Sequence, residues 1–272
     1  MTLVSVVMAG RDAEETIGEA IASVVAQTEP DWELVVVDDG SQDATVEVAR
    51  RSGDHRVRVV EAGRIGVLAQ LRNRGIEETA GEWVAILDAD DAWLPTKLER
   101  QLADAGDAGV VHTDADRLVD GRRTHVRVER RPGSLSAALV ENNFVYSSSV
   151  LIRRVVLAEH GAFDPDPALW GSPDYELWLR LARVTDFVYV DEPLVLYRVH
   201  PGQMSADVRR MSLGALAALE KAPLDREDPA YLRRIGILRV LAGEGGRREL
   251  LRAIRRRPLD RRAWRWLLRS LL

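Results

Sequence analysis

Residues 82–95 read EWVAILDADDAWLP, an apolar run that stops at three acids. The run 83–87 is typical of a strand buried on both faces, as in a parallel sheet. Asp88, Asp90 and Asp91 follow it at once, and clustered carboxylates repel one another and are costly to bury unpaired. Hard oxygen ligands suit Mg²⁺ or Mn²⁺, so this stretch predicts a metal site. A solvated turn is the alternative, above all for Asp91, because Asp favours loops and helix N-caps.

Composition narrows the class of protein. The chain has 272 residues, of which 46% are hydrophobic, enough for a large core in one domain or in one domain with an appendage. Cysteine is absent, which excludes disulfides and suits a reducing cytoplasm. The first ten residues predict a buried strand rather than a signal peptide. No apolar stretch approaches the length of a bilayer, so we expect no transmembrane helix and a cytoplasmic location.

The first half of the chain alternates strand and helix patterns. Apolar runs predict strands at 3–8, 33–38, 56–62, 83–87 and 108–114, and helical spacing predicts helices from 17, over 43–51 and 66–81, and from about 95. Such alternation indicates βαβ units and therefore an α/β fold with a mostly parallel sheet flanked by helices. Ligands of these sheets bind beyond the carboxyl ends of the strands, where the acidic runs fall.

Later segments are less regular. The patterns predict strands at 122–130, 147–154, 186–190 and 193–200, a helix over 173–184, and helices from residue 203 onward.

A second acidic run, VVVDDGS at 35–41, ends another predicted strand. Asp38 and Asp39 could accept hydrogen bonds from a ribose hydroxyl or a base N–H. They could equally form a strand-to-helix turn, with Ser41 or Asp43 capping the next helix. No G-x-x-x-x-G-K-[ST] motif occurs and no strand is followed by G-x-G-x-x-G, which argues against a kinase, a P-loop NTPase or a nicotinamide dehydrogenase.

Several blocks in fixed order resemble one family. VSVVMAG, ETIGEAIASVVAQT, WELVVVDDGSQDAT, GVLAQLRNRGIEETAGEWVAILDADDAWLPTKLE, PDYELWLRLA and YRVHPGQMS together look like the family-2 nucleotide-sugar glycosyltransferases of the GT-A fold, over roughly residues 3–205. The resemblance implies an enzyme, hexosyltransferase-like, that moves a sugar from a nucleotide-diphosphate sugar to an acceptor hydroxyl. It also implies a Mn²⁺ or Mg²⁺ cofactor and inversion by a single displacement.

The resemblance assigns nucleotide-sugar contacts by position. It implies that Asp39 binds the nucleobase and that Ala9 lines the same pocket. Arg72 would lie near the nucleotide, with Asn73 beside it. Asp88 would contact the nucleotide sugar as the first acid of the D-x-D motif.

The metal and the catalytic base are implied in the same way. Asp88 and Asp90 match the D-x-D motif, with Asp90 as the direct metal ligand, and His200 matches a histidine near the metal and diphosphate. Asp174 matches the catalytic base, although Ser172-Pro173-Asp174 also fits an ordinary helix start with an acid in the first turn.

Two departures from the family pattern bear on these roles. The loop after the first strand reads MAGRD instead of a Pro-x-Tyr-Asn-like run, and Pro173 stands where a Glu often precedes the base. Trp170 just upstream could stack on a sugar of the acceptor or the donor, or could be packing.

Residues 231–272 differ in charge from the rest of the chain. From residue 231 the chain has 13 arginines and 3 acids, a net charge of +10, while the remainder carries −15. Arginines recur there at every fourth position, at Arg257, Arg261, Arg265 and Arg269. Apolar residues lie on other helical faces, at Leu259, Ala263, Trp266 and Leu267. We expect a helical appendage that packs on the catalytic domain or another subunit, with peripheral contact to the inner face of a membrane as a close alternative. Nucleic acid is not favoured.

These patterns give a domain prediction and a set of rival functions. We expect a GT-A catalytic domain at 1–205, with a nucleotide-sugar half at about 1–113 and an acceptor half at about 114–205, followed by a basic helical region at 206–272. The acceptor could be a carbohydrate, a lipid-linked sugar or a small molecule, and a homo-oligomer is possible. The rivals are an inactive nucleotide-sugar-binding protein in a biosynthetic complex and a sugar nucleotidyltransferase. Nucleotidyltransferases usually have a Gly-rich, Arg-containing first loop, which the sequence MAGRDAEE of this chain does not match.

Overall fold

The computed structural model describes residues 4–126 and 135–271, which form two compact units. The sheet unit comprises 4–126, 145–163 and 184–200, and the helical unit comprises 135–144, 164–183 and 201–271. Segments of the two units alternate along the chain, and each unit is described by itself below.

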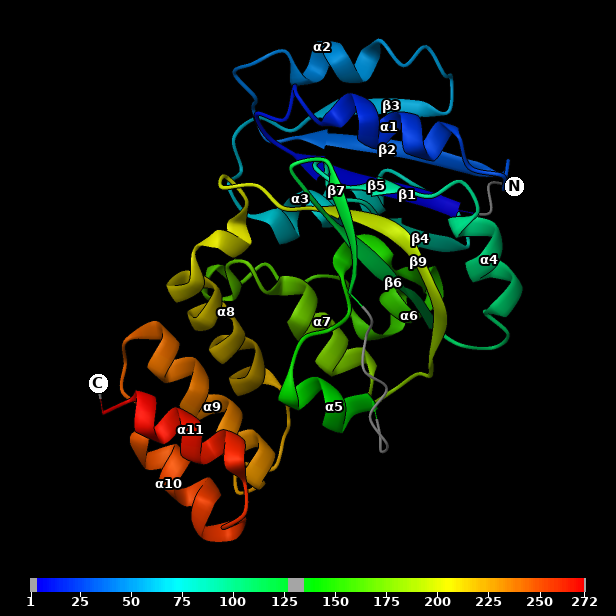
Figure 1. The fold of residues 1–272 in the computed structure, drawn as a ribbon. Helices are drawn as coiled ribbons and strands as arrows, with labels where there is room; N and C mark the ends of the chain where they lie inside the picture. Colours follow the sequence, from blue (N-terminus) through cyan, green and yellow to red (C-terminus); the bar gives the residue numbers. More distant parts are fainter. Residues whose placement is uncertain (1–3, 127–134, 272) are drawn as a thin grey trace. The chain divides into compact units, whose positions relative to one another are not determined.

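Four parallel strands form one half of the sheet in the order β3-β2-β1-β4 (Figure 1). Their bounds are β1 Val4–Gly10, β2 Trp32–Asp38, β3 Val57–Glu61 and β4 Trp83–Ile86. Gly10 pairs with Asp38, and Val7 pairs with Ile86, so the carboxyl ends of β1, β2 and β4 reach the same edge. The mostly parallel sheet expected from the alternating pattern is confirmed.

The other half of the sheet is mixed. It continues β4-β8-β6-β9-β5, with β7 paired to β6, and its strands are β5 Ala92–Trp93, β6 Val110–Val119, β7 Arg122–Val126, β8 Leu151–Arg153 and β9 Phe187–Arg198. Among these strands only β6 and β9 run parallel to each other.

Two strand predictions in this half need correction. The expected strands 186–190 and 193–200 are the single strand β9, because a register shift beside Pro193 lets the ladder with β6 continue as a bulge. The expected strand 147–154 begins instead with the 3₁₀ turn Ser147–Ser149. Residues 127–130 of the expected strand 122–130 lie outside the described residues.

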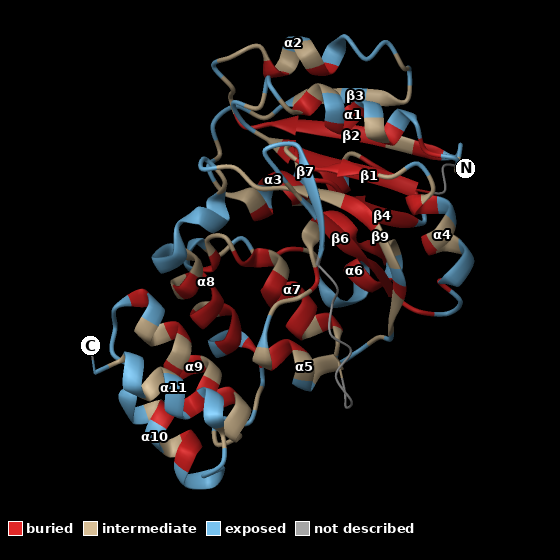
Figure 2. Cartoon of the chain, in the orientation of Figure 1, coloured by how far each residue is buried: buried red, intermediate tan, exposed pale blue. Residues whose placement is uncertain are grey.

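Helices cover both faces of the parallel strands. On one face α1 (Ile17–Val25), α2 (Thr45–Arg50) and α4 (Lys97–Asp104) bury apolar side chains against alternate strand residues such as Val6, Leu34 and Val36 (Figure 2). On the other face α3 (Leu68–Glu77) packs on Val35 and Val37 through Leu71. A Cβ at Gly75 of α3 would lie 2.4 Å from Val7 Cγ1, so this close approach requires glycine. Helix α6 (Arg154–His160), which the sequence patterns did not predict, follows β8.

The described part of the helical unit contains α5 Leu135–Glu141, α7 Pro173–Leu181, α8 Val208–Lys221, α9 Pro229–Ala242, α10 Arg247–Arg256 and α11 Arg261–Arg269, with 3₁₀ turns at Pro167–Leu169 and Met204–Ala206. The last three helices share a small core of Leu232, Leu250, Ala253, Ile254 and Ala263. Asp228 and Asp260 start α9 and α11 by accepting backbone N–H bonds. Among the described helices, none has both the length and the apolar character needed to cross a bilayer.

Candidate active site

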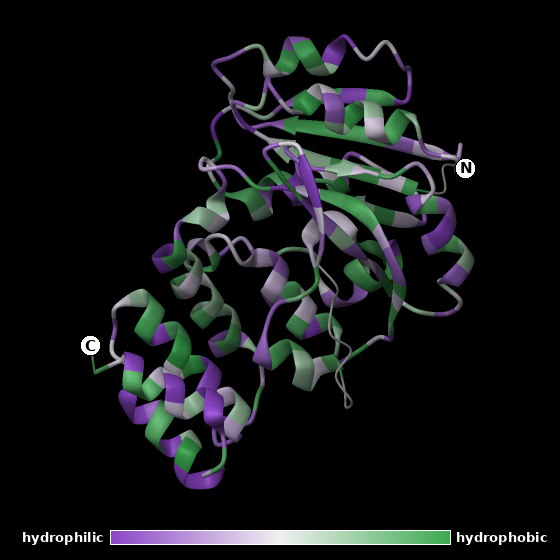
Figure 3. Ribbon diagram, viewed as in Figure 1, coloured by the Kyte–Doolittle hydropathy of each residue, from purple (hydrophilic) through white to green (hydrophobic). Residues whose placement is uncertain are grey.

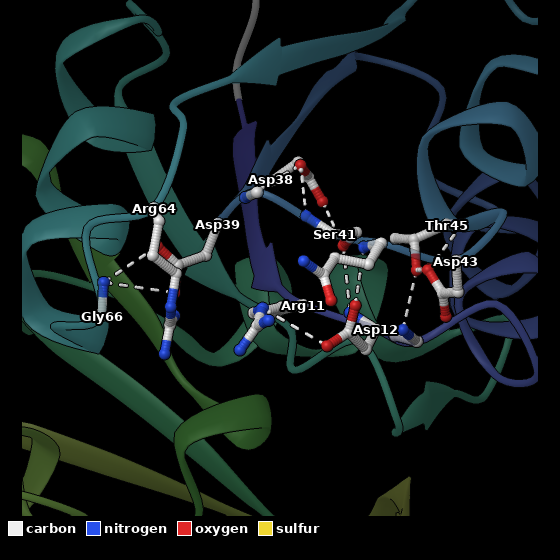
Figure 4. Close-up of polar contacts among 12 residues, drawn as sticks. Arg11, Asp12, Asp38, Asp39, Ser41, Asp43, Thr45, Arg64 and Gly66 are labelled. Atoms are coloured by element: carbon white, nitrogen blue, oxygen red, sulfur yellow. Dashed lines mark hydrogen bonds and ion pairs between the residues drawn. The ribbon is translucent and has the colours of Figure 1, made fainter.

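The turn after β2 is held together by Asp38. Its Oδ2 accepts hydrogen bonds from the backbone N–H of Gly40 at 3.0 Å and of Ser41 at 3.1 Å, and the Ser41 hydroxyl donates to its Oδ1 (Figure 4). Gly40 has a φ of +68°, which glycine adopts without strain. Asp38 therefore builds the turn that presents its neighbour. The expected cap by Ser41 or Asp43 is wrong, because Ala44 is the N-cap residue of α2 and Ser41 is bonded to Asp38.

The loop after β1 is fastened to the same turn. Asp12 N–H donates to Ser41 Oγ at 3.0 Å, and the Gln42 N–H donates to Asp12 Oδ1 at 2.8 Å (Figure 4). The MAGRD loop thus has its own anchoring contacts, although it departs from the family pattern.

Asp39 is buried and fully engaged within the protein. Its Oδ1 accepts from the N–H groups of Ile65 at 2.6 Å and Gly66 at 2.9 Å, and the Arg64 guanidinium pairs with its Oδ2 (Figure 4). The Asp39 side chain is 5% exposed, whereas that of Arg64 is 56% exposed. Arg64 is not among the site residues predicted from the sequence; its place between Gly63 and Gly66 is typical of a loop but does not indicate its partner.

Ala9 is the last residue but one of β1. It pairs in register with Val37 and packs with Val35, Val37 and Leu71. The next residue, Gly10, accepts the Asp39 N–H at 3.0 Å, and a Cβ on Gly10 would lie 2.8 Å from Ala89 Cβ. The ends of β1, β2 and β4 are therefore brought together as predicted.

In the acidic turn after β4, Asp88 is paired with a buried arginine. Arg72 Nη2 donates to Asp88 Oδ1 at 2.6 Å, and the Arg72 guanidinium carbon lies 5.2 Å from the Phe163 ring centroid. The neighbouring Asn73 exchanges hydrogen bonds through its amide with the backbone of Phe163 at 2.8 and 3.0 Å. The sequence-predicted Arg72 and Asp88 are thus in direct contact.

Asp91 is the most deeply buried acid of the turn. Ser148 Oγ accepts the Asp88 N–H at 3.1 Å and donates to Asp91 Oδ2 at 2.6 Å, while the Arg198 N–H donates to Asp91 Oδ1 at 3.0 Å. Burial raises the pKa of Asp91 well above its usual value, and the charges of Asp90 and Asp88 add to this. Asp91 fixes β4 to its neighbours, so the solvated-turn alternative is wrong for this residue.

Asp90, the second acid of the turn, is in contact with His200, which follows β9. His200 Nε2 lies 3.0 Å from Asp90 Oδ2, and their side chains are 38% and 35% exposed. Burial raises the pKa of Asp90, and the neighbouring Asp88 charge raises it further. The structure therefore places His200 beside Asp90, the second acid of the D-x-D motif.

These side chains suit a hard divalent cation in their chemistry. The carboxylates of Asp88 and Asp90 repel each other, and a cation would relieve that repulsion. The imidazole of His200, in contact with Asp90, adds a nitrogen ligand to these oxygen ligands. Within residues 4–126 and 135–271, however, no group of three or more His, Asp and Glu side chains is already arranged as a metal cage. Arg72 holds the Asp88 carboxylate, whereas the Asp90 carboxylate lies against His200.

The predicted base belongs to the helical unit. Ser172 occupies the N-cap of α7, Pro173 its first turn, and Asp174 follows, although the Ser172 side chain makes no capping hydrogen bond. Asn143 Nδ2 donates to Asp174 Oδ2 at 3.3 Å. Trp170 has the Arg210 guanidinium stacked over its ring at 4.0 Å, which indicates packing for at least one ring face.

Comparison with known proteins identifies the class. The sequence model of the family described as Glycosyl transferase family 2 matches residues 5–158, which is more than half of the chain. The chain belongs to this family and is a nucleotide-sugar glycosyltransferase with the GT-A type of fold. The family resemblance read from the ordered blocks is confirmed.

Three individual proteins illustrate the likeness. The chain is 32% identical over 240 residues to the succinoglycan biosynthesis protein ExoO of Rhizobium meliloti, covering 82% of this chain and 68% of ExoO. It is 38% identical over 101 residues to the UDP-Glc:alpha-D-GlcNAc-diphosphoundecaprenol beta-1,3-glucosyltransferase WfgD of Escherichia coli, covering 37% of this chain and 40% of WfgD. The mannosyltransferase PcManGT of Pyrobaculum calidifontis, solved with GDP-Man and Mn²⁺, superposes with a TM-score of 0.64 at 18% identity over 98% of this chain and 84% of that one.

Proposed function

We propose that the protein transfers a hexose from a nucleotide-diphosphate sugar to an acceptor hydroxyl, with Mn²⁺ or Mg²⁺ and with inversion at the anomeric carbon. The observation that carries the proposal is the pairing of Asp90 with His200 beside Asp88 at the carboxyl edge of the sheet. Family membership supplies the reaction class. The relative solved with GDP-Man and Mn²⁺ supports a metal of this kind.

Donor binding falls to residues of the sheet unit. Asp39 would accept a hydrogen bond from a nucleobase N–H beside Ala9, once Arg64 has withdrawn from its carboxylate. Asp90 and His200 would hold the cation, with Asp88 kept in place by Arg72. When bound, the cation would neutralise charge on the departing diphosphate.

Asp174 would act as the general base. The first turn of a helix stabilises an ionised carboxylate, and the Asn143 amide donates a hydrogen bond to it. Asp174 would take the proton of the acceptor hydroxyl while the hydroxyl oxygen attacks the anomeric carbon and the bond to the diphosphate breaks. One displacement of this kind inverts the anomeric configuration.

The acceptor proposal draws on the relatives. ExoO is named for the biosynthesis of a polysaccharide, and the acceptor in the name of WfgD is a sugar on diphosphoundecaprenol. A lipid-linked saccharide is therefore the acceptor class we propose.

The test compares Asp174→Asn with the unaltered protein. We expect the variant to keep nucleotide-sugar binding, measured by thermal shift with and without Mn²⁺, and to lose transfer by about 10²–10⁴-fold, the usual contribution of a general base. Asp164→Asn, at an acid of the same unit that pairs with Lys221, is the matched control and should keep activity. Normal turnover by Asp174→Asn would reject the base.

The same assay addresses the rival of an inactive sugar-nucleotide-binding protein. Donor-dependent stabilisation without any transfer or donor hydrolysis in the unaltered chain, over a panel of nucleotide sugars and lipid-linked acceptors, would favour that rival.

A further inference from the structure

The last two helices expose large apolar side chains that their own core does not cover. Leu259, in the turn between α10 and α11, is 94% exposed, and Leu268 and Leu271 are 63% and 61% exposed. The ring of Trp264 is held by a hydrogen bond from its Nε1 to the Pro258 carbonyl at 2.9 Å, and Trp264 is 45% exposed. The tryptophan is therefore fixed over the turn that carries Leu259.

Helical geometry places Trp264 and Leu268, four residues apart, on one stripe of α11. Leu271 follows just beyond the C-cap residue, Ser270. Ala263, by contrast, is buried in the core shared with α9 and α10, and Trp266 and Leu267 pack against that core. The exposed stripe is thus separate from the face that holds α11 in the helical unit.

Arginines flank this stripe. Arg261, Arg265 and Arg269 recur every fourth residue on the adjoining exposed face. We call these three arginines together with Leu259, Trp264, Leu268 and Leu271 the basic apolar face. Figure 3 shows the resulting alternation of hydrophilic and hydrophobic segments along α10 and α11.

Among the described residues, no carboxylate forms an ion pair with the arginines of this face. Other arginines of the region are paired: Arg252 and Arg256 with Glu227, Arg233 with Asp260 and Glu141, and Arg262 with Glu141. Arg261, Arg265 and Arg269, like Arg255 and Arg257 nearby, have no carboxylate at ion-pair distance among the residues that the structure describes. The acids of this region therefore form ion pairs with some of its arginines, while the other arginines are exposed to solvent.

We propose that the basic apolar face binds the surface of an anionic lipid bilayer. Arginines attract anionic headgroups, and Trp and Leu side chains on the same face can enter the boundary between headgroups and acyl chains. Nucleic acid would satisfy the arginines and leave the leucines in water. A membrane surface satisfies both kinds of side chain, and it does so whether or not the catalytic proposal is right.

The experiment is co-sedimentation of the full chain with vesicles of phosphatidylglycerol and phosphatidylcholine, and with vesicles of phosphatidylcholine alone. We expect binding to the anionic vesicles only, weakened by salt. The triple variant Arg261→Gln/Arg265→Gln/Arg269→Gln should bind about 10²-fold more weakly, because each surface arginine contributes roughly tenfold or somewhat less. The variant Leu259→Ser/Leu268→Ser should also lose most of its binding.

The matched control is Arg50→Gln/Arg51→Gln/Arg74→Gln, which makes the same change of charge at exposed arginines of the sheet unit. It should bind as the unaltered protein does. Circular dichroism and denaturant unfolding of each variant check that the helices persist.

A measurement that needs no disruption of the arginines uses Trp264. The difference in fluorescence between the unaltered protein and Trp264→Phe should shift to the blue on anionic vesicles and be quenched by brominated lipid. No vesicle binding, equal binding to neutral vesicles, or full binding by the triple variant would overturn the proposal. So would tighter binding to duplex DNA than to vesicles, or burial of this face in a dimer that the triple variant dissolves.

Discussion

The two acidic turns of the sheet, after β2 and after β4, look alike in sequence and differ in how their charge is met. After β2, Asp38 receives backbone N–H bonds, and Asp39 receives both backbone N–H bonds and the Arg64 guanidinium. After β4, crowding and burial leave raised pKa values on Asp90 and Asp91. The first turn meets its carboxylates with backbone N–H groups and an arginine. The second crowds three carboxylates together in spite of their donors, and an added cation would relieve that repulsion.

The largest effect should come from breaking the second turn at Asp90. Asp90→Asn removes one of the two donors that we assign to the cation, and we expect kcat/KM for transfer to fall by about 10²-fold or more, because a metal that stabilises developing charge contributes several kcal/mol. Removing a crowded charge should not lower the free energy of unfolding. Steady-state transfer assays over a Mn²⁺ titration, with urea unfolding in parallel, measure both quantities.

Asp107→Asn, at an exposed loop acid, is the control for that comparison. Unchanged activity in Asp90→Asn, or an equal loss in both variants, would contradict the role of the second turn.

At Asp38 in the first turn we expect a loss of stability rather than a direct loss of activity. Asp38→Ala leaves the N–H groups of Gly40 and Ser41 without their acceptor, which should cost roughly 1–3 kcal/mol in the free energy of unfolding. Denaturant unfolding measures the loss, and donor binding should weaken only as far as the turn itself is disturbed. If the variant were as stable as the unaltered chain but inactive, Asp38 would be a ligand-binding residue and the comparison would fail.

Sequence patterns could predict which acids lie at the edge of the sheet but not which groups pair with them. Alternating apolar runs and helical spacing are local signals, so β1, β2, β4 and the acids that end them were predicted correctly. The contacts of Asp39 with Arg64 and of Asp91 with Ser148 join residues 25 and 57 positions apart, and no local pattern encodes such pairs. The family resemblance paired Asp90 with His200, 110 residues away, because it carries tertiary information that a single sequence lacks.

The middle of the chain shows the same limit. Two strands are predicted where the structure has β9, and only the register with β6 shows that a bulge absorbs Pro193. Helix α5 and helix α6 are seven residues each, too short for a periodic pattern to stand out.

A buried lysine behind the second turn offers a pH test. Trp93 Nε1 donates to the Ser148 carbonyl at 2.8 Å, and Lys97 Nζ lies 4.0 Å from the centroid of the Trp93 ring and donates to Gln101 at 2.6 Å. Burial lowers the pKa of Lys97 well below its usual value. The unfolded chain then binds more protons between that lowered pKa and the ordinary value of 10.5, so stability should rise with pH across this window and be lost as pH falls through it.

Lys97→Met should flatten this dependence while keeping the aliphatic packing. Urea unfolding from neutral to alkaline pH measures the slope, and Lys221→Met is the contrasting control, because ion pairs with Asp164 and Asp166 raise the pKa of Lys221 instead. The same slope in the unaltered protein and Lys97→Met would show that this lysine is not the group responsible.

The smallest effect should come from Arg64, and it sharpens the comparison most directly. If the first turn is satisfied from within, a nucleobase must displace the Arg64 guanidinium from Asp39, and that displacement lowers the apparent affinity. Arg64→Ala should therefore bind the nucleotide diphosphate a few-fold more tightly in calorimetry. The cost in stability should be below about 1 kcal/mol, since Arg64 is largely exposed and the N–H groups of Ile65 and Gly66 still donate to Asp39. Asp39→Asn should bind more weakly in either background. Weaker binding by Arg64→Ala alone would mean that Arg64 contacts the donor itself, and the first turn would then be an open site like the second.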